Sequence, residues 1–70
     1  MRILIVGANG FIGHSLIDRI LDTTDWSVCG IDLDASRLGA ALARPRFTFH
    51  AADMTRERAL VEQEVRDSDV

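Results

Sequence analysis

Residues 4–13 read LIVGANGFIG, an apolar run that is interrupted by Gly7, Gly10 and Gly13. The Asn-Gly pair at its centre lies between apolar residues, which is a strong signal for a two-residue β-hairpin turn. The alternative is a phosphate-binding turn that joins a buried strand to a helix. The residues on either side of the glycines distinguish these two interpretations.

The flanking residues favour a strand, a glycine turn and a helix. Residues 3–6 are continuously apolar, as expected for a central parallel strand that is buried on both faces, whereas a hairpin strand with one solvated face would alternate. After the glycines, apolar residues recur at steps of four and five with polar residues between them, which is helical periodicity. The apolar stripe consists of Ile12, Leu16, Ile17, Ile20 and Leu21.

The composition indicates a globular domain. The chain has 70 residues, too few for more than one domain, and 47% of them are hydrophobic. Its net charge is −3, and its eight basic residues are all Arg and are scattered along the chain. We therefore expect no nucleic-acid partner and no membrane partner, and no apolar stretch approaches the roughly 20 residues of a membrane helix. Without a recognisable signal peptide, the cytoplasm is the default compartment.

Two further features of the composition exclude particular chemistries. The single cysteine, Cys29, cannot form an internal disulfide, and its apolar surroundings in the sequence favour a small buried hydrophobe over a catalytic thiol. The chain contains no Lys, which excludes a P-loop, because that motif needs a lysine to neutralise the terminal phosphates.

Strands and helices alternate through the rest of the chain. The predicted strands span residues 3–6, 27–31 and 47–52, and the predicted helices span residues 11–21, 35–43 and 56–66. Short loops between such elements imply right-handed βαβ units and a parallel sheet with strand order 3-2-1. The first two helices would then cover one face and the last helix the other, with the first strand at an open edge. Residues 69–70 are interpreted as the approach to a fourth strand.

Two polar residues are assigned as helix N-caps, Asp34 for residues 35–43 and Thr55 for residues 56–66. Apolar residues recur on one side of each of these helices. The side chains predicted to face inward are Leu38, Leu42, Leu60, Val61 and Val65.

Each glycine of the opening stretch has a separate predicted task. Gly7 allows a sharp turn at the end of the strand, Gly10 allows the backbone to approach a pyrophosphate, and Gly13 allows the helix to pack closely on the sheet. The amides of Phe11 and Ile12 lie at the helix N-terminus, where unpaired N–H groups and the helix dipole favour an anion. The side chains of these two residues are predicted to lie in the core.

Asp32 closes the second strand about 20 residues after the last glycine, the spacing expected of the acid that binds the adenosine ribose hydroxyls. A carboxylate there would repel a 2′-phosphate, which favours NAD over NADP. The alternative is that Asp32 or Asp34 only caps the following helix, and we assign the cap to Asp34. Arg37 could accept a 2′-phosphate, although a solvated arginine on a helix face is the favoured interpretation.

Asp53 and Met54 follow the third strand, where the crevice of an open α/β sheet should receive the adenine. The Asp53 carboxylate can accept from the adenine amino group, and the Met54 amide can donate to a ring nitrogen. A helix-capping role for Asp53 is an open alternative. His14 and His50 have no partner pattern for metal or acid–base chemistry and receive no role.

The sequence GANGFIG at residues 7–13, together with Asp32 and the Asp53-Met54 pair, resembles the amino terminus of the extended short-chain dehydrogenase/reductases. This is the NAD-dependent epimerase/dehydratase family, which acts on nucleotide sugars. Its GxxGxxG spacing differs from the GxGxxG of most dinucleotide folds, and the resemblance spans essentially all 70 residues. Within the family, GANGFIGHSL, VCGIDLDASRL and RPRFTFHAADM are most similar to the UDP-glucuronic acid decarboxylase domain of the bifunctional polymyxin-resistance enzyme.

The resemblance implies the amino-terminal half of a Rossmann-type α/β fold, with residues 1–70 as the amino-terminal part of an NAD-binding domain. For the parent protein it implies NAD as cofactor, a nucleotide-sugar substrate and a homo-oligomer. NAD would oxidise the sugar at C4, the 4-keto acid would lose carbon dioxide, and a Tyr-x-x-x-Lys pair would handle the proton. Neither Tyr nor Lys occurs in the chain, so we expect its catalytic and sugar-binding parts to lie beyond residue 70.

The leading hypothesis is therefore an NAD-binding amino-terminal segment that is inactive by itself. A non-catalytic dinucleotide-sensing module and a structural half-domain that needs a partner chain are the alternatives. No catalytic or metal-binding residue is predicted. The predicted cofactor-binding residues are Gly7, Asn9, Gly10, Phe11, Ile12, Gly13, Asp32, Asp53 and Met54.

Overall fold

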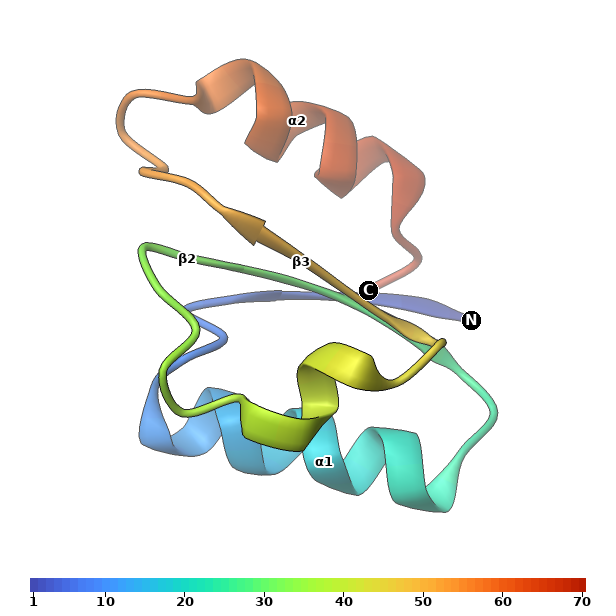
Figure 1. The fold of residues 1–70 in the computed structure, drawn as a ribbon. Helices are drawn as coiled ribbons and strands as arrows, with labels where there is room; N and C mark the ends of the chain where they lie inside the picture. Colours follow the sequence, from blue (N-terminus) through green and yellow to red (C-terminus); the bar gives the residue numbers. More distant parts are fainter.

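The computed structural model describes all 70 residues and contains one parallel sheet of three strands (Figure 1). The strands are β1 (Arg2–Val6), β2 (Ser27–Asp32) and β3 (Phe47–Ala51), and they pair in the order β1-β2-β3. This is the predicted order 3-2-1 counted from the other edge, so the predicted half of a doubly wound α/β sheet is confirmed. The strand pairing places the carboxyl ends of β2 and β3 at one edge, where Asp32 lies opposite Ala51.

Helices cover both faces of the sheet (Figure 1). Helix α1 (Phe11–Thr23) and the short 3₁₀ helix η1 (Gly39–Ala43) lie on one face, and α2 (Arg58–Asp67) lies on the other. This is the distribution that right-handed crossovers require. None of these helices is long and apolar enough to span a lipid bilayer.

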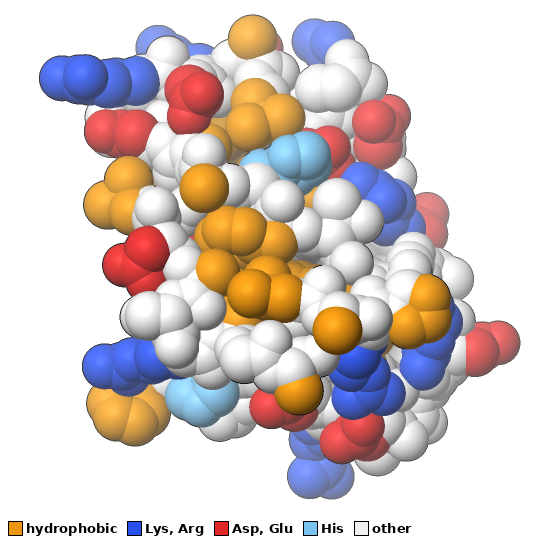
Figure 2. Space-filling view, in the orientation of Figure 1, with side chains coloured by type: hydrophobic (Ala, Val, Ile, Leu, Met, Phe, Trp, Pro, Cys, Tyr) orange, Lys and Arg blue, Asp and Glu red, His pale blue; other side chains and the backbone are white.

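The hydrophobic core lies on the α1 and η1 side of the sheet. Burying an Ile, Leu or Val side chain contributes roughly 1.5–3 kcal/mol, so this layer supplies most of the folding free energy. Figure 2 shows that other hydrophobic side chains remain uncovered along the middle of one face, at the level of the sheet. The buried core consists of Ile3, Ile5, Ala8, Ile17, Leu21, Val28, Leu38, Ala41 and Phe47.

The continuous apolar run of β1 predicted a strand that is buried on both faces. That prediction is wrong. Ile3 and Ile5 are buried, whereas Leu4 is half-buried and Val6 is exposed, because β1 is an edge strand. Residues 69–70 lie along its free edge, where the Leu4 amide donates to the Val70 carbonyl at 2.8 Å. The predicted approach to a fourth strand is therefore present.

The helix predicted for residues 35–43 is wrong in its first half. Asp34 Oδ1 accepts from the Ser36 amide at 3.0 Å, so Asp34 stabilises a turn rather than an α-helix. Gly39 then adopts a φ of +47°, which interrupts right-handed helical geometry, and only η1 follows. Leu38 is buried as predicted, but Leu42 is exposed because a 3₁₀ turn places it differently from an α-helix.

The last helix begins at Arg58 rather than Arg56, and Thr55 does not cap it. The Thr55 amide and hydroxyl both donate to Asp53 Oδ1, which forms a separate turn before α2. Leu60 and Val61 are half-buried, but Val65, predicted to face inward, is 57% exposed. Glu64 takes the inward position and is only 8% exposed.

Glu64 is buried because it has polar partners on the sheet, one of which is the charged Arg2. Arg2 donates from Nη2 to Glu64 Oε2, and His50 Nε2 lies 3.2 Å from Glu64 Oε1. The hydrogen bond from Arg2 holds the pKa of Glu64 below its ordinary value. On this face of the sheet, α2 is therefore held by polar contacts as well as by Leu60 and Val61.

The Glu64 contacts predict a specific loss of stability in acid. Because the folded-state pKa of Glu64 is the lower one, its carboxylate stabilises the fold above the ordinary pKa of 4.5 and loses this effect as the pH falls through the folded-state value. We expect Glu64→Gln to be less stable than the unaltered chain at pH 7 and to show a smaller further loss on acidification. Denaturant unfolding at pH 7, 5 and 3.5 measures this difference.

The matched control is Glu62→Gln, on the exposed side of the same helix. It should follow the unaltered chain at every pH. If Glu64→Gln and Glu62→Gln showed the same pH dependence, the buried ion pair would have no measurable role in stability.

Candidate functional site

The glycine loop between β1 and α1 is tied to the end of β2. Gly7 has a φ of +79°, a left-handed conformation that side chains disfavour, and this reverses the chain direction after Val6. The amides of Gly7 and Ala8 donate to the Ile31 carbonyl at 2.8 and 3.3 Å. The predicted sharp turn at Gly7 is confirmed, and the loop lies over the carboxyl end of the sheet.

Helix α1 begins directly after this loop. Gly10 is its N-cap, with an extended backbone and no side chain that accepts from the first-turn amides. Those amides have no carbonyl four residues earlier within the helix, an arrangement that favours a nearby anion. A Cβ at Gly10 would lie 3.3 Å from the Gly7 carbonyl oxygen, a tight but tolerable contact.

Gly13 packs more closely than any other glycine of the loop. A Cβ there would overlap the Gly7 carbonyl oxygen and lie 3.0 Å from the Ala8 carbonyl oxygen. The predicted close packing is thus real, but its partner is the backbone of the loop itself rather than a strand. The glycine at this position allows α1 to begin close to Gly7 and Ala8.

The side chains of Phe11 and Ile12 do not lie in the core, contrary to prediction. They are 75% and 82% exposed, because the first turn of α1 extends past the buried part of the helix, where Ile17 and Leu21 contact the sheet. Ile12 lines an open apolar crevice with Val6 at the end of β1. The predicted role of Phe11 and Ile12 as donors of backbone N–H groups does not depend on side-chain burial.

Asp32 ends β2 and contacts the glycine loop. Its Oδ2 accepts from the Asn9 amide at 2.9 Å and its Oδ1 from the Leu33 amide at 2.7 Å. Asp32 therefore caps no helix, and Asp34 stabilises the turn that follows. A carboxylate offers about four lone-pair positions, so two acceptor positions of Asp32 are still available to a ligand.

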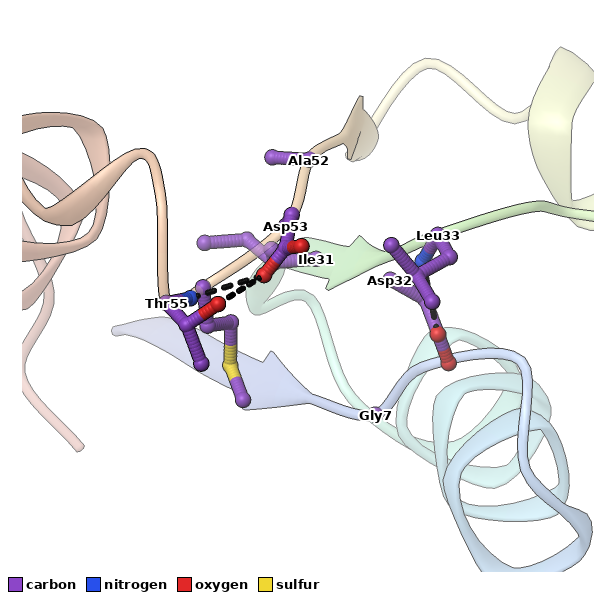
Figure 3. A pocket seen from close by; sticks show the side chains of 8 residues that line it. Gly7, Ile31, Asp32, Leu33, Ala52, Asp53 and Thr55 are labelled. Atoms are coloured by element: carbon purple, nitrogen blue, oxygen red, sulfur yellow. Dashed lines mark hydrogen bonds between the residues drawn. The ribbon is translucent and has the colours of Figure 1, made fainter.

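The structure brings Asp32 together with Asp53 and Met54, as predicted. These residues and Gly7 line a cavity of about 190 Å³ at the carboxyl ends of β2 and β3 (Figure 3). The Ala52 amide donates to the Asp32 carbonyl at 2.9 Å, which holds the two strand ends beside each other. The remaining lining residues are Ile31, Leu33, Ala52 and Thr55.

The Asp53 carboxylate is partly used within its own turn. Figure 3 shows Oδ1 accepting from the amide and the hydroxyl of Thr55, at 2.9 and 2.6 Å. These hydrogen bonds hold the pKa of Asp53 below its ordinary value. Asp53 therefore stabilises a turn before α2 and does not cap the helix, so the helix-capping alternative is wrong, and its other oxygen remains an acceptor at the cavity.

The Asn9 side chain connects the glycine loop to the turn after β2. Its Oδ1 accepts from the Arg37 amide at 2.6 Å, and its Nδ2 donates to Asp34 Oδ1 at 2.7 Å. Arg37 is exposed, as predicted, but it lies in a turn rather than on a helix face, and its guanidinium lies 4.2 Å over the exposed Phe11 ring. No periodic pattern in the sequence signals these hydrogen bonds, since they join residues 25 and 28 positions apart.

Residues 3–70 match the family described as the saccharopine dehydrogenase NADP binding domain. Among solved structures, it is 46% identical to the PbgP3 protein from Burkholderia pseudomallei, with a TM-score of 0.94 over 97% of this chain and 20% of that one. It is 28% identical to UDP-glucuronic acid 4-epimerase from Bacillus cereus in complex with NAD, with a TM-score of 0.83 over 99% of this chain and 24% of that one. The chain thus spans about a fifth to a quarter of these proteins.

Substitutions at the two glycines of the α1 N-terminus should lower stability by different amounts. Gly13→Val should lower the free energy of unfolding by about 3 kcal/mol or more, because its side chain would overlap backbone atoms that have no room to move. Gly10→Val should cost about 1 kcal/mol, the loss of a favourable N-cap residue. Denaturant unfolding followed by circular dichroism measures both, and equal losses would show that the close packing at Gly13 is not critical.

Proposed function

The chain belongs to the family described as the saccharopine dehydrogenase NADP binding domain, and we propose that it holds the adenosine and pyrophosphate half of NAD for a nucleotide-sugar oxidoreductase. Membership of this family confirms the predicted Rossmann-type fold and nicotinamide dinucleotide cofactor. The observation that carries the proposal is the cavity in which Asp32, Asp53 and Met54 meet beside the glycine loop.

Each part of this site suits one part of the dinucleotide. The free acceptor positions of Asp32 suit the two ribose hydroxyls, and the cavity wall at Asp53 and Met54 suits the adenine edge. The uncapped α1 N-terminus beside Gly10 suits the pyrophosphate. When bound, the dinucleotide supplies a hydride acceptor, while the residues of this chain bind and orient it.

The choice of NAD over NADP rests on Asp32, although the family description names NADP. The cavity lining contains two aspartates and no basic side chain, so a 2′-phosphate would meet negative charge without a cation to offset it. Arg37, the nearest candidate for a phosphate partner in the sequence, is held over Phe11. The B. cereus relative, which is in complex with NAD, provides further support.

The substrate class is a further part of the proposal. The B. cereus epimerase has also been solved with UDP-glucuronic acid and NAD, and the chain is 28% identical to it. On the sequence resemblance, we place the parent protein among the UDP-glucuronic acid decarboxylases, with an epimerase or dehydratase as the alternative. A homo-oligomer in the cytoplasm, with residues 1–70 as the amino-terminal part of its NAD-binding domain, completes the proposal.

Replacing Asp32 should change the cofactor preference. Asp32→Ala removes the charged acceptor for the ribose hydroxyls, so NAD affinity should fall by on the order of 1–3 kcal/mol, roughly 5- to 150-fold. NADP affinity should fall less or rise, because the repulsion of the 2′-phosphate is also removed. Calorimetric titration of both dinucleotides provides the measurement.

Two controls separate ligand contact from loop support. Asp32→Asn has nearly the same shape and retains one acceptor oxygen, so it should preserve the loop while weakening NAD binding. Asp25→Ala, at an exposed position outside the cavity, should bind NAD like the unaltered chain. If Asp32→Ala bound NAD with unchanged affinity, the ribose assignment would be wrong.

A turnover assay can test whether this chain only binds the dinucleotide or also catalyses hydride transfer. Hydride transfer from a sugar requires a proton acceptor near the reacting carbon, and the chain has neither Tyr nor Lys. Residues 1–70 should therefore show no NADH formation with NAD and UDP-glucuronic acid, followed by absorbance. Sustained NADH formation would contradict the proposal that this chain only binds and orients the dinucleotide.

A further inference from the structure

A cluster of three potential metal ligands lies on the α2 face of the sheet, away from the cofactor cavity. Cys29 comes from β2, His50 from β3 and Glu64 from α2. One ligand atom from each residue lies within 4.8 Å of the other two. None of the three residues lines the cavity at the strand ends, so the proposed function does not use them.

The three side chains carry the ligand types that zinc prefers. A thiolate sulfur, an imidazole nitrogen and a carboxylate oxygen all bind Zn²⁺ at about 2.0–2.3 Å, whereas Mg²⁺ and Ca²⁺ take oxygen ligands. Two of the residues, Cys29 and Glu64, are buried, and His50 is half-buried. The mixture of sulfur, nitrogen and oxygen therefore selects a cation of the zinc class.

The spacing is close to that of a tetrahedral site. Ligand atoms around tetrahedral zinc lie about 3.3–3.6 Å apart, as follows from the bond lengths. His50 Nε2 and Glu64 Oε1 are already 3.2 Å apart. The Cys29 sulfur lies within 4.8 Å of the other two ligand atoms, so it needs to approach by at most roughly 1.5 Å to complete this geometry.

Arg2 supports the carboxylate from outside the cluster. It donates from Nη2 to Glu64 Oε2, so Oε1 is the oxygen that faces His50. Such outer contacts orient the ligands of protein metal sites. The thiolate and the carboxylate would together offset the two positive charges of the cation.

We propose that Cys29, His50 and Glu64 form a binding site for a divalent cation of the zinc class, which joins β2, β3 and α2. Three protein ligands leave one coordination position for water. This site is independent of the proposed dinucleotide site, and its failure would leave that function untouched.

Binding at this site should depend on pH. A thiol must lose its proton to bind a metal ion, so binding releases one proton from Cys29, and the apparent affinity should rise about tenfold per pH unit in the range where the other two ligands are already unprotonated. His50 must also be neutral to bind.

Cobalt(II) is the spectroscopic probe for the site. Titration of the chain with Co²⁺ at pH 7 and 8 should give a thiolate-to-cobalt charge-transfer band with one-to-one stoichiometry, tighter by about tenfold at the higher pH. Zn²⁺ should remove the band by competition and raise the melting temperature. Cys29→Ala should abolish the band, and His50→Ala should weaken binding by at least about tenfold.

Two more variants test the contact of Arg2 with Glu64 and the contribution of the other histidine to metal binding. Arg2→Met should weaken binding by about 10- to 100-fold, because Glu64 loses the group that orients it. His14→Ala removes the other histidine of the chain and should change nothing. Circular dichroism confirms that each variant is folded before titration.

Protection of the thiol gives a readout that does not depend on cobalt. Zn²⁺ should slow the alkylation of Cys29 in the unaltered chain but not in His50→Ala. The proposal is overturned if no charge-transfer band forms with folded protein at pH 8. It is also overturned if His50→Ala and Glu64→Gln bind Co²⁺ as tightly as the unaltered chain, since the cation would then be held by the thiol alone.

Discussion

The close approach of the α1 N-terminus to the glycine loop is the constraint on which the rest of the structure depends. Because Gly13 has no side chain, α1 begins in contact with the backbone of Gly7 and Ala8. The same loop is hydrogen-bonded to the end of β2 through the Ile31 carbonyl and the Asp32 carboxylate. One packing requirement therefore fixes the direction of α1, the end of the sheet and the position of the anion-binding amides.

Asp32 contributes both to this scaffold and to the cofactor cavity. Its hydrogen bond to the Asn9 amide holds the loop, and Asp32 also lines the cavity together with Asp53 and Met54. Asn9 extends the connection to the turn at Asp34 and Arg37. The site is thus preorganised by contacts between segments that are distant in sequence, which lowers the entropic cost of binding a dinucleotide.

The order of elements, and the meeting of Asp32, Asp53 and Met54 at one cavity, could be predicted from the sequence, because both depend on local patterns. The glycine spacing, the position of Asp32 after an apolar strand and the Asp53-Met54 pair are features of that kind. The exposure of Phe11 and the burial of Glu64 could not be predicted, because they depend on which surfaces other elements cover. The turn at Asp34 was missed for a different reason: a side-chain hydrogen bond and a left-handed Gly39 override the helical periodicity of the residues around them.

The helices on the two faces of the sheet are held by different interactions, apolar on one face and partly ionic on the other. None of the nine core residues belongs to α2. Helix α2 is held by the Arg2–Glu64 ion pair and the His50 contact as well as by Leu60 and Val61, and the ion pair weakens in acid, whereas the apolar contacts of the opposite layer contain no charge that acid could remove. Opening of the molecule should therefore be directional. A sub-global unfolding event would release α2 first and expose Cys29 to solvent, while α1, the glycine loop and the paired strands stay assembled.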